Sequence, residues 1–353
     1  MLSLSLEVNW LPTLPKLDHL YRMTDRTGII QHATYHLPAF STGYTTDDNA
    51  RALKVALELW ELNQDPSVLA LAETYLSFLV YAQRPDGLWR NFIDYSRNYL
   101  EERGSDDSFG RAVQAICSVA AQRSEHRFQI LASELLERAK KQLPSLSSPR
   151  AMAFAIIGLS KLNKSYHHFI RQLADNLSSL YHTTTGEGWY WFEDYVTYCN
   201  GALPEAMLMA YRALGKKSYL NIGLESLSFL SDRLLKTGKL EVVGNRGWWH
   251  RGGEPALFDQ QPVDAAHLVS AHLAAYQLTG QREHLTCAQR CYAWFEGENS
   301  LGLSLYDPLS GGCFDGLTPE NVNKNQGAES ILAYLEANLA LSRVEAKGRE
   351  ATG

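Results

Sequence analysis

Two short segments of the sequence carry adjacent aspartates, which could serve as acids and bases. TTDDNARAL spans residues 45–53 and GSDDSFGRA spans 104–112, and in each segment an arginine follows the second aspartate by three or four residues. A polar or acidic side chain at a helix start satisfies free backbone N–H groups, and acid in the first turn suits the helix dipole. Capping needs only one carboxylate. We therefore expect Asp47 and Asp106 to cap their helices, and Asp48 and Asp107 to face a cavity.

Further charged residues stand at the starts of later helix candidates. Glu205 lies in LPEAM, Asp264 in PVDAAH and Glu329 in NQGAES, whereas SSPRAMAF carries Arg150 instead. If these helix starts meet, the acids converge on one cavity, and the helix dipoles keep carboxylates ionised there. Arg51 and Arg111 lie one turn after the paired aspartates and could bind them. Helix capping alone remains the alternative explanation for the acids.

Convergent carboxylates are what cleavage of a glycosidic bond requires. A carboxylic acid with a raised pKa protonates the leaving oxygen, and an ionised carboxylate activates water or phosphate or attacks the sugar carbon. Glu193 and Asp194 are flanked by aromatic residues that would desolvate them, so they are the candidates for the raised pKa. Asp107, Asp48 and Glu329 are the candidates for the ionised partner.

Polar segments between the helix candidates are rich in aromatic residues, glycine, aspartate and arginine. Five tryptophans fall in them, and although a tryptophan is usually a core residue, flat apolar faces beside hydrogen-bonding groups suit a sugar ring. We expect carbohydrate to be the ligand. The expected binding residues are Tyr44, Trp89, Arg90, Arg111, Trp189, Trp191, Glu205, Trp248, Trp249, Arg251, Asp259, Gln260, Asp264, Asn325 and Gln326.

Helical periodicity runs through the whole chain and divides into two kinds of helix. Amphipathic helices are expected at 13–22, 66–83, 126–143, 165–182, 217–236 and 281–296. Helices that are apolar on nearly every side alternate with them, at 48–62, 107–122, 149–162, 202–214, 263–279 and 327–342. A helix that is apolar all round is a buried one. Six hairpins with buried inner helices predict an all-α fold, an (α/α)6 toroid; an open solenoid would need polar capping faces at both ends.

The connections between these helices differ in length. Short links follow each inner helix, while long links precede the inner helices at 84–105, 183–201, 237–262 and 297–326. Long loops are usually functional, so we place the site on the rim where the inner helices begin. Residues 1–345 are expected to form one domain, and 346–353 a disordered tail.

Composition narrows the classes of function. The 353 residues carry a net charge of −6 without a block of like charge, which argues against nucleic-acid and membrane partners. The N-terminal segment lacks the pattern of a signal peptide and no run is long and apolar enough to span a membrane, so we expect a cytoplasmic protein. Five cysteines favour a reducing compartment. Cys287 and Cys291 are one helical turn apart, but no second pair completes a zinc site, and we expect no metal or cofactor.

Six longer segments resemble a bacterial family of six-hairpin, (α/α)6-toroid proteins. They are TGYTTDDNARAL, RNFIDYSRNYLEERGSDDSFGRA, WYWFEDYVTYCNGALPEA, VGNRGWWHRGG, FDQQPVDAAH and YDPLSGGCFDGLTPENVNKNQGAES. Members of that family occur alone or joined to glycosyltransferase domains and are often labelled glycosyltransferase. The resemblance implies carbohydrate chemistry, with mannose-containing oligosaccharides as a candidate substrate. This chain has no Gly-rich nucleotide-sugar pattern, which argues against the transferase label.

Three functions therefore compete. The first is a glycoside hydrolase or phosphorylase that acts on a short oligosaccharide. The second is a non-catalytic, glycan-binding accessory to a partner glycosyltransferase. The third is a sugar 2-epimerase, for which His250 and His267 near the rim are the candidate bases. Prenyl transfer and terpene cyclisation are disfavoured, because neither aspartate pair has the spacing DDxxD.

Overall fold

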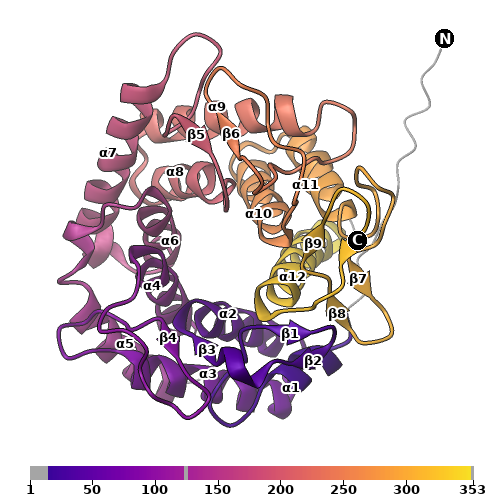
Figure 1. Cartoon of the computed structure of the whole chain (residues 1–353). Coiled ribbons are helices and arrows are strands. Elements are labelled where there is room, and N and C mark those ends of the chain that lie inside the picture. The colour runs from indigo at the N-terminus through magenta and orange to yellow at the C-terminus, as the bar shows by residue number, and fades with distance from the viewer. Residues whose placement is uncertain (1–14, 123–125, 351–353) are drawn as a thin grey trace.

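The computed structural model describes residues 15–122 and 126–350, which form two concentric rings of helices (Figure 1). The inner ring consists of α2 (Thr46–Asn63), α4 (Asp106–Ala121), α6 (Pro149–Leu159), α8 (Ala202–Leu214), α10 (Pro262–Thr279) and α12 (Ala328–Glu350). The outer ring consists of α1 (Asp18–Met23), α3 (Pro66–Ala82), α5 (His126–Ala139), α7 (His167–Thr184), α9 (Lys217–Leu234) and α11 (Arg282–Ala293).

The inner ring is closed. Each inner helix packs against the next one along the chain, and α12 packs against α2. This confirms the predicted (α/α)6 toroid and excludes the open solenoid. The inner helices are buried on nearly every side, as their apolar composition predicts. The first outer helix, expected at 13–22, begins only at Asp18, and residues 13 and 14 lie outside the described residues.

Glycine allows two of the inner helices to approach each other closely. A Cβ atom on Gly110 of α4 would lie 2.7 Å from both Cα and the carbonyl oxygen of Ala151 in α6. On the other side of the same contact, a Cβ atom on Gly158 of α6 would lie 2.7 Å from Cα of Gln114. The starts of α4 and α6 are therefore held near each other, which matters because both helices contribute to the site.

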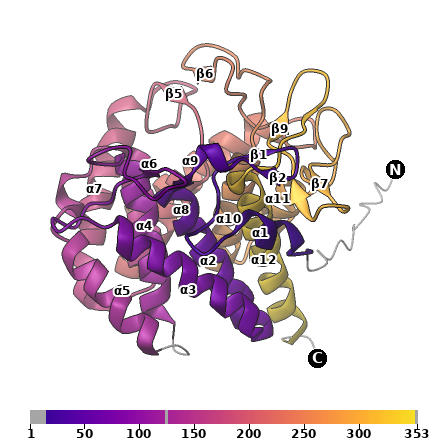
Figure 2. The same ribbon diagram turned by 60° about the horizontal axis from the view of Figure 1, so that its bottom comes forward.

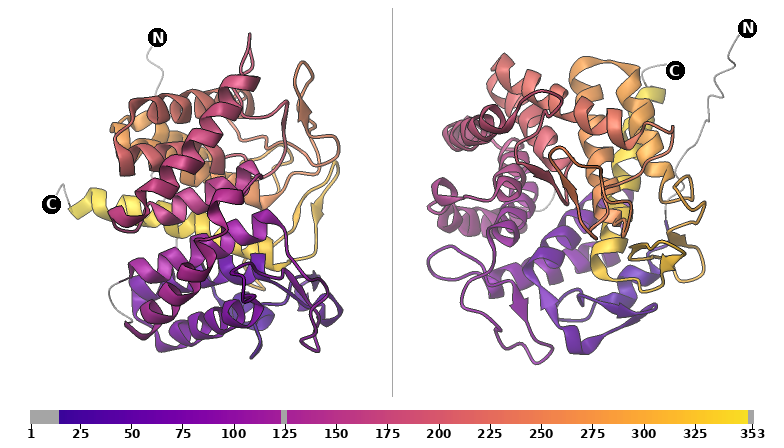
Figure 3. Two further views of the ribbon diagram at one scale, coloured as in Figure 1. Left: turned by 90° about the vertical axis from the view of Figure 1, so that its left-hand side faces the viewer. Right: turned by 45° about the horizontal axis from the view of Figure 1, so that its top comes forward.

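The long connections gather on one face of the toroid (Figures 2 and 3). They contain 3-10 turns and five antiparallel pairs of two-residue strands. The pairs are β1 (Ala33–Thr34) with β2 (Leu37–Pro38), β3 (Tyr44–Thr45) with β4 (Phe92–Ile93), β5 (Tyr195–Val196) with β6 (Trp249–His250), β7 (Tyr306–Asp307) with β8 (Gly312–Cys313), and β9 (Gly316–Leu317) with β10 (Val322–Asn323). The side chains in the first turn of each inner helix therefore lie beneath these loops, on the rim where the site was predicted.

The C-terminal end of α12 lies on the opposite face (Figure 3). This helix continues to Glu350, five residues into the segment for which a tail was predicted, and residues 351–353 lie outside the described part. None of the described helices is long and apolar enough to cross a membrane. The five cysteines are free thiols, and all except the half-buried Cys287 are buried.

Candidate active site

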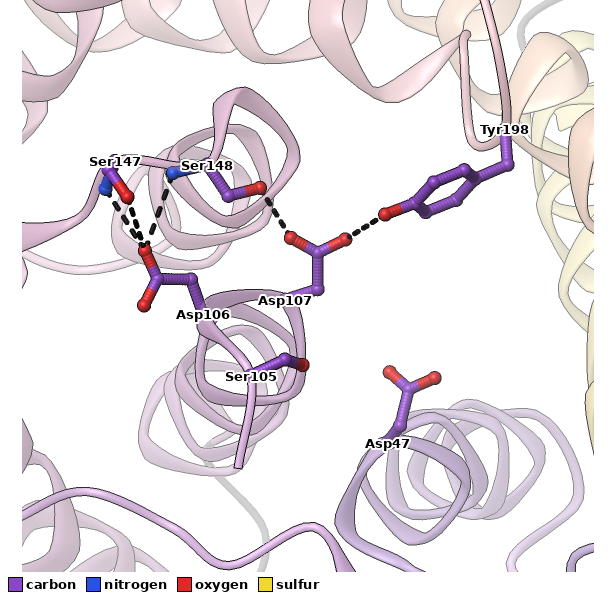
Figure 4. A pocket seen from close by; sticks show the side chains of 7 residues that line it. All are labelled: Asp47, Ser105, Asp106, Asp107, Ser147, Ser148 and Tyr198. Carbon is purple, nitrogen blue, oxygen red and sulfur yellow. Dashed lines mark hydrogen bonds between the residues drawn. The ribbon is translucent and has the colours of Figure 1, made fainter. Parts of the chain in front are cut away.

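A hollow of about 590 Å3 opens at the N-terminal ends of α2, α4 and α6. Its lining residues share short polar or acidic side chains, with one tyrosine from the connection before α8. They are Asp47, Ser105, Asp106, Asp107, Ser147, Ser148 and Tyr198 (Figure 4). Three carboxylates thus share one opening, as the doubled aspartates of the sequence suggested.

Hydroxyl groups, rather than aspartates, cap the helices at this hollow. The side-chain oxygen of Thr45 accepts the N–H of Asp48, that of Ser105 accepts the N–H of Ser108, and that of Ser148 accepts the N–H of Ala151. The prediction that Asp47 and Asp106 are the caps is therefore wrong. Because a hydroxyl takes each cap position, the carboxylates remain available for other contacts.

Asp47 faces the hollow between two arginines. Its Oδ2 lies 2.8 Å from Nη2 of Arg51, and its Oδ1 lies 2.8 Å from Nε of Arg111. Burial on its own would raise the pKa of Asp47, but the two guanidinium groups outweigh burial and hold the pKa below its usual range. Asp47 is therefore a fixed negative charge at the edge of the hollow.

Asp48 lies behind the hollow, which reverses the predicted roles of the first aspartate pair. Its side chain is 6 % exposed, accepts a hydrogen bond from the hydroxyl of Thr45 and contacts Arg51 at 3.1 Å. Burial raises the pKa of Asp48 to about 7, against the opposing effect of Arg51. Consecutive helical residues point about 100° apart, and here Asp47 turns to the hollow while Asp48 turns away from it.

Asp107 is held by two hydroxyl groups (Figure 4). Ser148 donates to its Oδ1 at 2.5 Å, and Tyr198 donates to its Oδ2 at 2.7 Å. Burial and the neighbouring charge of Asp107 raise the pKa of the Tyr198 phenol, so the phenol keeps its proton. Both partners of Asp107 can either donate or accept a hydrogen bond. Asp107 is therefore held between the cap of α6 and the connection before α8 by two hydroxyl groups.

Asp106 supports the site from its edge. Its Oδ2 accepts hydrogen bonds from the N–H and the hydroxyl of Ser147 and from the N–H of Ser148. Burial would raise the pKa of Asp106, but these bonds from the 147–148 turn lower it overall. Asp106 thereby fixes the turn that places the Ser148 hydroxyl on Asp107.

Glu329 joins the acidic group from the opposite end of the sequence. It stands in the first turn of α12, and its Oε2 lies 2.8 Å from Nη1 of Arg51. Arg51 therefore binds Asp47, Asp48 and Glu329 at once. Ring closure thus brings Glu329 to an arginine that lies 278 residues earlier in the sequence.

Two further predicted acids lie in the wall of the ring, Asp264 buried and Glu205 half-buried. Asp264 is 2 % exposed, and its Oδ1 accepts the backbone N–H of Asn200 at 3.2 Å and the side-chain amide at 2.9 Å. Its Oδ2 is buried without a partner. Burial raises the pKa of Asp264 to about 7, and it does the same to Glu205, which faces the ammonium group of Lys54. Neither residue lines the hollow described above.

Glu193 and Asp194 do not have the apolar surroundings that were predicted. Glu193 pairs with Arg150 at 2.8 Å, and the same guanidinium donates to the carbonyl oxygen of Tyr198 and the hydroxyl of Thr197. Arg150 thus clamps the segment that presents Tyr198. The Asp194 side chain is 69 % exposed and pairs with Arg251.

Most of the rim tryptophans belong to the core. Trp89, Trp189, Trp191 and Trp249 are each at most 6 % exposed, so the prediction that they form sugar platforms is wrong. The indole N–H groups of Trp89, Trp189 and Trp249 donate to backbone carbonyl oxygens. Long loops need apolar anchors of their own, and these rings provide them by packing on outer helices such as α9. Only Trp248 is partly exposed.

The remaining predicted binding residues hold loops together away from the hollow. Tyr44 is buried and donates to Asp25, and Arg90 stacks on Tyr99. Arg251 donates to the carbonyl oxygen of Thr184, and Asp259 pairs with Arg246. The amide side chains bind as follows: Gln260 to Trp294 and Ser300, Asn325 to the N–H of Tyr35, and Gln326 to Ser310 and Asp307. Their polar side chains satisfy the backbone and side-chain groups of irregular segments.

Of the residues that line the hollow, only Asp107 was predicted to face a cavity. Asp47 and Asp106 were predicted as caps, and Ser105, Ser147, Ser148 and Tyr198 were not candidates, although all four lie in or beside motifs that were recognised. A small polar residue before a doubled aspartate was a usable signal for the cap. Tyr198 was hidden among the other aromatic residues of WYWFEDYVTYCN.

Of the two histidines considered for isomerase chemistry, His267 lies inside the ring and His250 is exposed on the rim. His267 is 5 % exposed and packs on the ring of Phe154, with ring centroids 5.6 Å apart. Burial, assisted by the charge of Arg111, lowers the pKa of His267 well below its usual value. Among the described residues, no group of three or more His, Cys, Asp or Glu side chains is placed to hold a metal ion.

Comparison with solved structures decides the fold. Cellobiose 2-epimerase from Bacillus thermoamylovorans superposes with a TM-score of 0.73 at 13% identity over 94% of this chain and 96% of the other. A D-mannose isomerase gives a TM-score of 0.69 at 12% identity over 93% and 96%. An α-1,6-mannanase of Salegentibacter in complex with a mannotetraose gives 0.63 at 14% identity over 93% and 96%. The chain shares the toroid of these sugar enzymes.

At such low identities, the likeness establishes the architecture alone. No protein-family model matches the sequence, and no curated protein matches it. The fold implied by the resemblance is confirmed, whereas its connection to glycosyltransferases stays a prediction.

Proposed function

We propose that the protein is a carbohydrate-active enzyme that cleaves a glycosidic bond at the hollow between α2, α4 and α6. The observation that carries the proposal is the arrangement of Asp47 and Asp107 in one opening. One carboxylate is fixed as an anion by two arginines, and the other has only hydroxyl partners. Glycoside cleavage needs two carboxyl groups whose surroundings differ in this way.

Asp107, which the sequence suggested as the ionised partner, is instead the proton donor in this proposal. It transfers its proton to the oxygen of the leaving sugar while the glycosidic C–O bond breaks, and the Ser148 and Tyr198 hydroxyls reorient to follow the change in charge. Asp47 stabilises the positive charge that develops at the anomeric carbon, and it either directs an incoming water or phosphate or attacks that carbon itself.

A structural relative supports the importance of adjacent aspartates. Salegentibacter α-1,6-mannanase was studied as an inactive variant in which two consecutive aspartates were replaced. The present chain has such a pair in Asp106 and Asp107, at the start of an inner helix and within the hollow.

Incubation of the purified protein with manno- and gluco-oligosaccharides, with and without phosphate, tests the proposal. We expect cleavage, which is abolished in Asp107→Asn and retained in the control Asp175→Asn, whose carboxylate pairs with Lys216 on the outer ring. A requirement for phosphate identifies a phosphorylase, and cleavage without phosphate a hydrolase. No cleavage under either condition refutes the proposal, and binding without turnover supports the accessory function.

A sugar 2-epimerase is the second candidate, and His267 favours it. A buried imidazole that stays neutral at physiological pH can accept a proton from carbon, and His267 lies near Arg111, which itself binds Asp47 at the hollow. Sugar epimerases are also among the structural relatives. Incorporation of deuterium at C2 from heavy water, lost in His267→Asn and retained in Asp107→Asn, would establish the epimerase in place of the glycosidase.

A further inference from the structure

We propose that a platform formed by Tyr198, Trp248, Tyr195 and His250 binds a second sugar unit next to the hollow. The proposal rests on the proposed glycosidase function and deepens it, because it makes the substrate a glycan of at least two units. The platform lies on the short ribbon made by β5 and β6, in which Tyr195 pairs with His250 and Val196 with Trp249.

The platform starts at the hollow itself. Tyr198 lines the hollow through its hydroxyl, which binds Asp107, and its ring lies 6.2 Å from the ring of Trp248. Farther along the ribbon, the rings of Tyr195 and His250 are 6.3 Å apart. Tyr195 is 42 % exposed and Tyr198 39 %, so each of the two ring pairs presents an aromatic ring to solvent. Exposed aromatic faces of this kind suit the C–H face of a pyranose.

Trp248 differs from the buried rim tryptophans in its exposure. Its ring is partly exposed, and within the described part of the chain its indole N–H has no hydrogen-bond partner, whereas Trp189 and Trp249 donate to backbone carbonyls and the unpartnered N–H of Trp191 is buried. That free donor can bind a sugar hydroxyl.

The backbone of Trp248 is held in an uncommon conformation. Its φ angle is +56°, in the left-handed region that a bulky residue rarely adopts, and its N–H binds the carbonyl oxygen of Gly244. With this backbone conformation, the ring of Trp248 packs near Tyr198, whereas the ring of Trp249, the first residue of β6, packs on Phe229 in the core. Such conformations persist where the surrounding structure enforces them, and they cluster at binding sites.

Tyr198 connects the platform to the chemistry. One side chain bonds Asp107 through its hydroxyl, packs near Trp248, and lies over the guanidinium of Arg150, with 4.6 Å between that group and the ring centroid. A sugar on the platform would fix this ring and with it the hydroxyl on Asp107. Binding of a non-reacting sugar unit would then assist cleavage at the neighbouring bond.

The dependence of the kinetics on substrate length tests the platform. For Trp248→Ala, we expect the KM for a tetrasaccharide to rise about tenfold, while kcat/KM on an aryl monoglycoside, which does not reach the platform, changes less than about twofold. Tyr190→Ala is the matched control. Tyr190 is equally exposed at 39 %, but it lines a separate hollow beside α9, so its loss should not alter the length dependence.

Two outcomes overturn the proposal. In the first, Trp248→Ala loses activity equally on the tetrasaccharide and on the aryl monoglycoside. In the second, Tyr190→Ala changes the dependence on substrate length as much as Trp248→Ala does. Calorimetry with the same tetrasaccharide separates this proposal from the proposed function. If the parent binds the glycan without cleaving it and Trp248→Ala weakens binding about tenfold, the platform stands and the glycosidase falls. If the parent binds no oligosaccharide, both fail.

Discussion

Asp264 provides a quantitative test of the electrostatics inside the ring. Its carboxyl group is 2 % exposed, and only one of its two oxygens has hydrogen-bond partners. The substitution Asp264→Asn keeps the shape and the acceptor for Asn200 but removes the ionisable group. Comparison of the two proteins therefore isolates the effect of one buried charge on stability.

The pKa determines the direction of the effect. Burial raises the pKa of Asp264 from 3.8 to about 7, so the folded state binds the proton more tightly than the unfolded state does. The stability that this proton contributes is fully present below pH 3.8 and is lost as the pH rises through about 7. At pH 5, nearly all of the folded protein but little of the unfolded chain carries it, which corresponds to about 3 kcal/mol. Nearly all of this contribution is gone at about pH 8.

Urea denaturation of both proteins from pH 5 to pH 8 measures this effect. We expect the free energy of unfolding of the parent to fall by about 3 kcal/mol more than that of Asp264→Asn over this range. Asp48 and Glu205, whose pKa values burial also raises to about 7, give the same slope in both proteins and cancel in the difference. Parallel curves would refute the reasoning, because they would mean that Asp264 is ionised in the folded protein throughout.

Three further substitutions test the site and the packing. Tyr198→Phe removes one hydrogen bond to Asp107, so in steady-state assays on an aryl glycoside kcat should fall about tenfold or more with little change in KM; an unchanged kcat would separate this bond from catalysis. Gly110→Ala places a methyl group 2.7 Å from the backbone of Ala151, so the free energy of unfolding measured in urea should fall by about 1–3 kcal/mol. A stabilised variant would contradict the close packing of α4 and α6. Trp191→Ala empties a fully buried position and should lower the free energy of unfolding by about 3–5 kcal/mol in the same assay, whereas Trp248→Ala should lower it much less. Similar losses in the two variants would argue against the difference in burial between these tryptophans.

The architecture of this protein follows from the periodicity of its sequence. An inner helix must be apolar on every side and an outer helix on one, so the two kinds can be distinguished from composition, and their alternation gives the number of hairpins. The doubled aspartates marked the starts of α2 and α4, because charged residues in an otherwise apolar helix occur where the helix emerges from the core.

Which of two adjacent aspartates faces the hollow could not be predicted. Asp47 and Asp48 differ by one helical step. The step is set by where Thr45 caps the helix and by contact with Asn91, which lies 44 residues away in sequence, just before β4. The tryptophans posed a similar problem. Loops and substrate platforms both use flat aromatic rings, and only three-dimensional packing shows that Trp249 is buried while Trp248 is not.

Contact between the first and the last inner helix has a consequence for biosynthesis. Arg51 obtains one of its three carboxylate partners from α12, which the ribosome completes last among the described helices. A nascent chain without α12 exposes the flank of α2 and leaves Arg51 short of Glu329. The acidic centre is thus assembled only when translation has passed the sixth hairpin, and a prematurely terminated product would be inert as well as unstable.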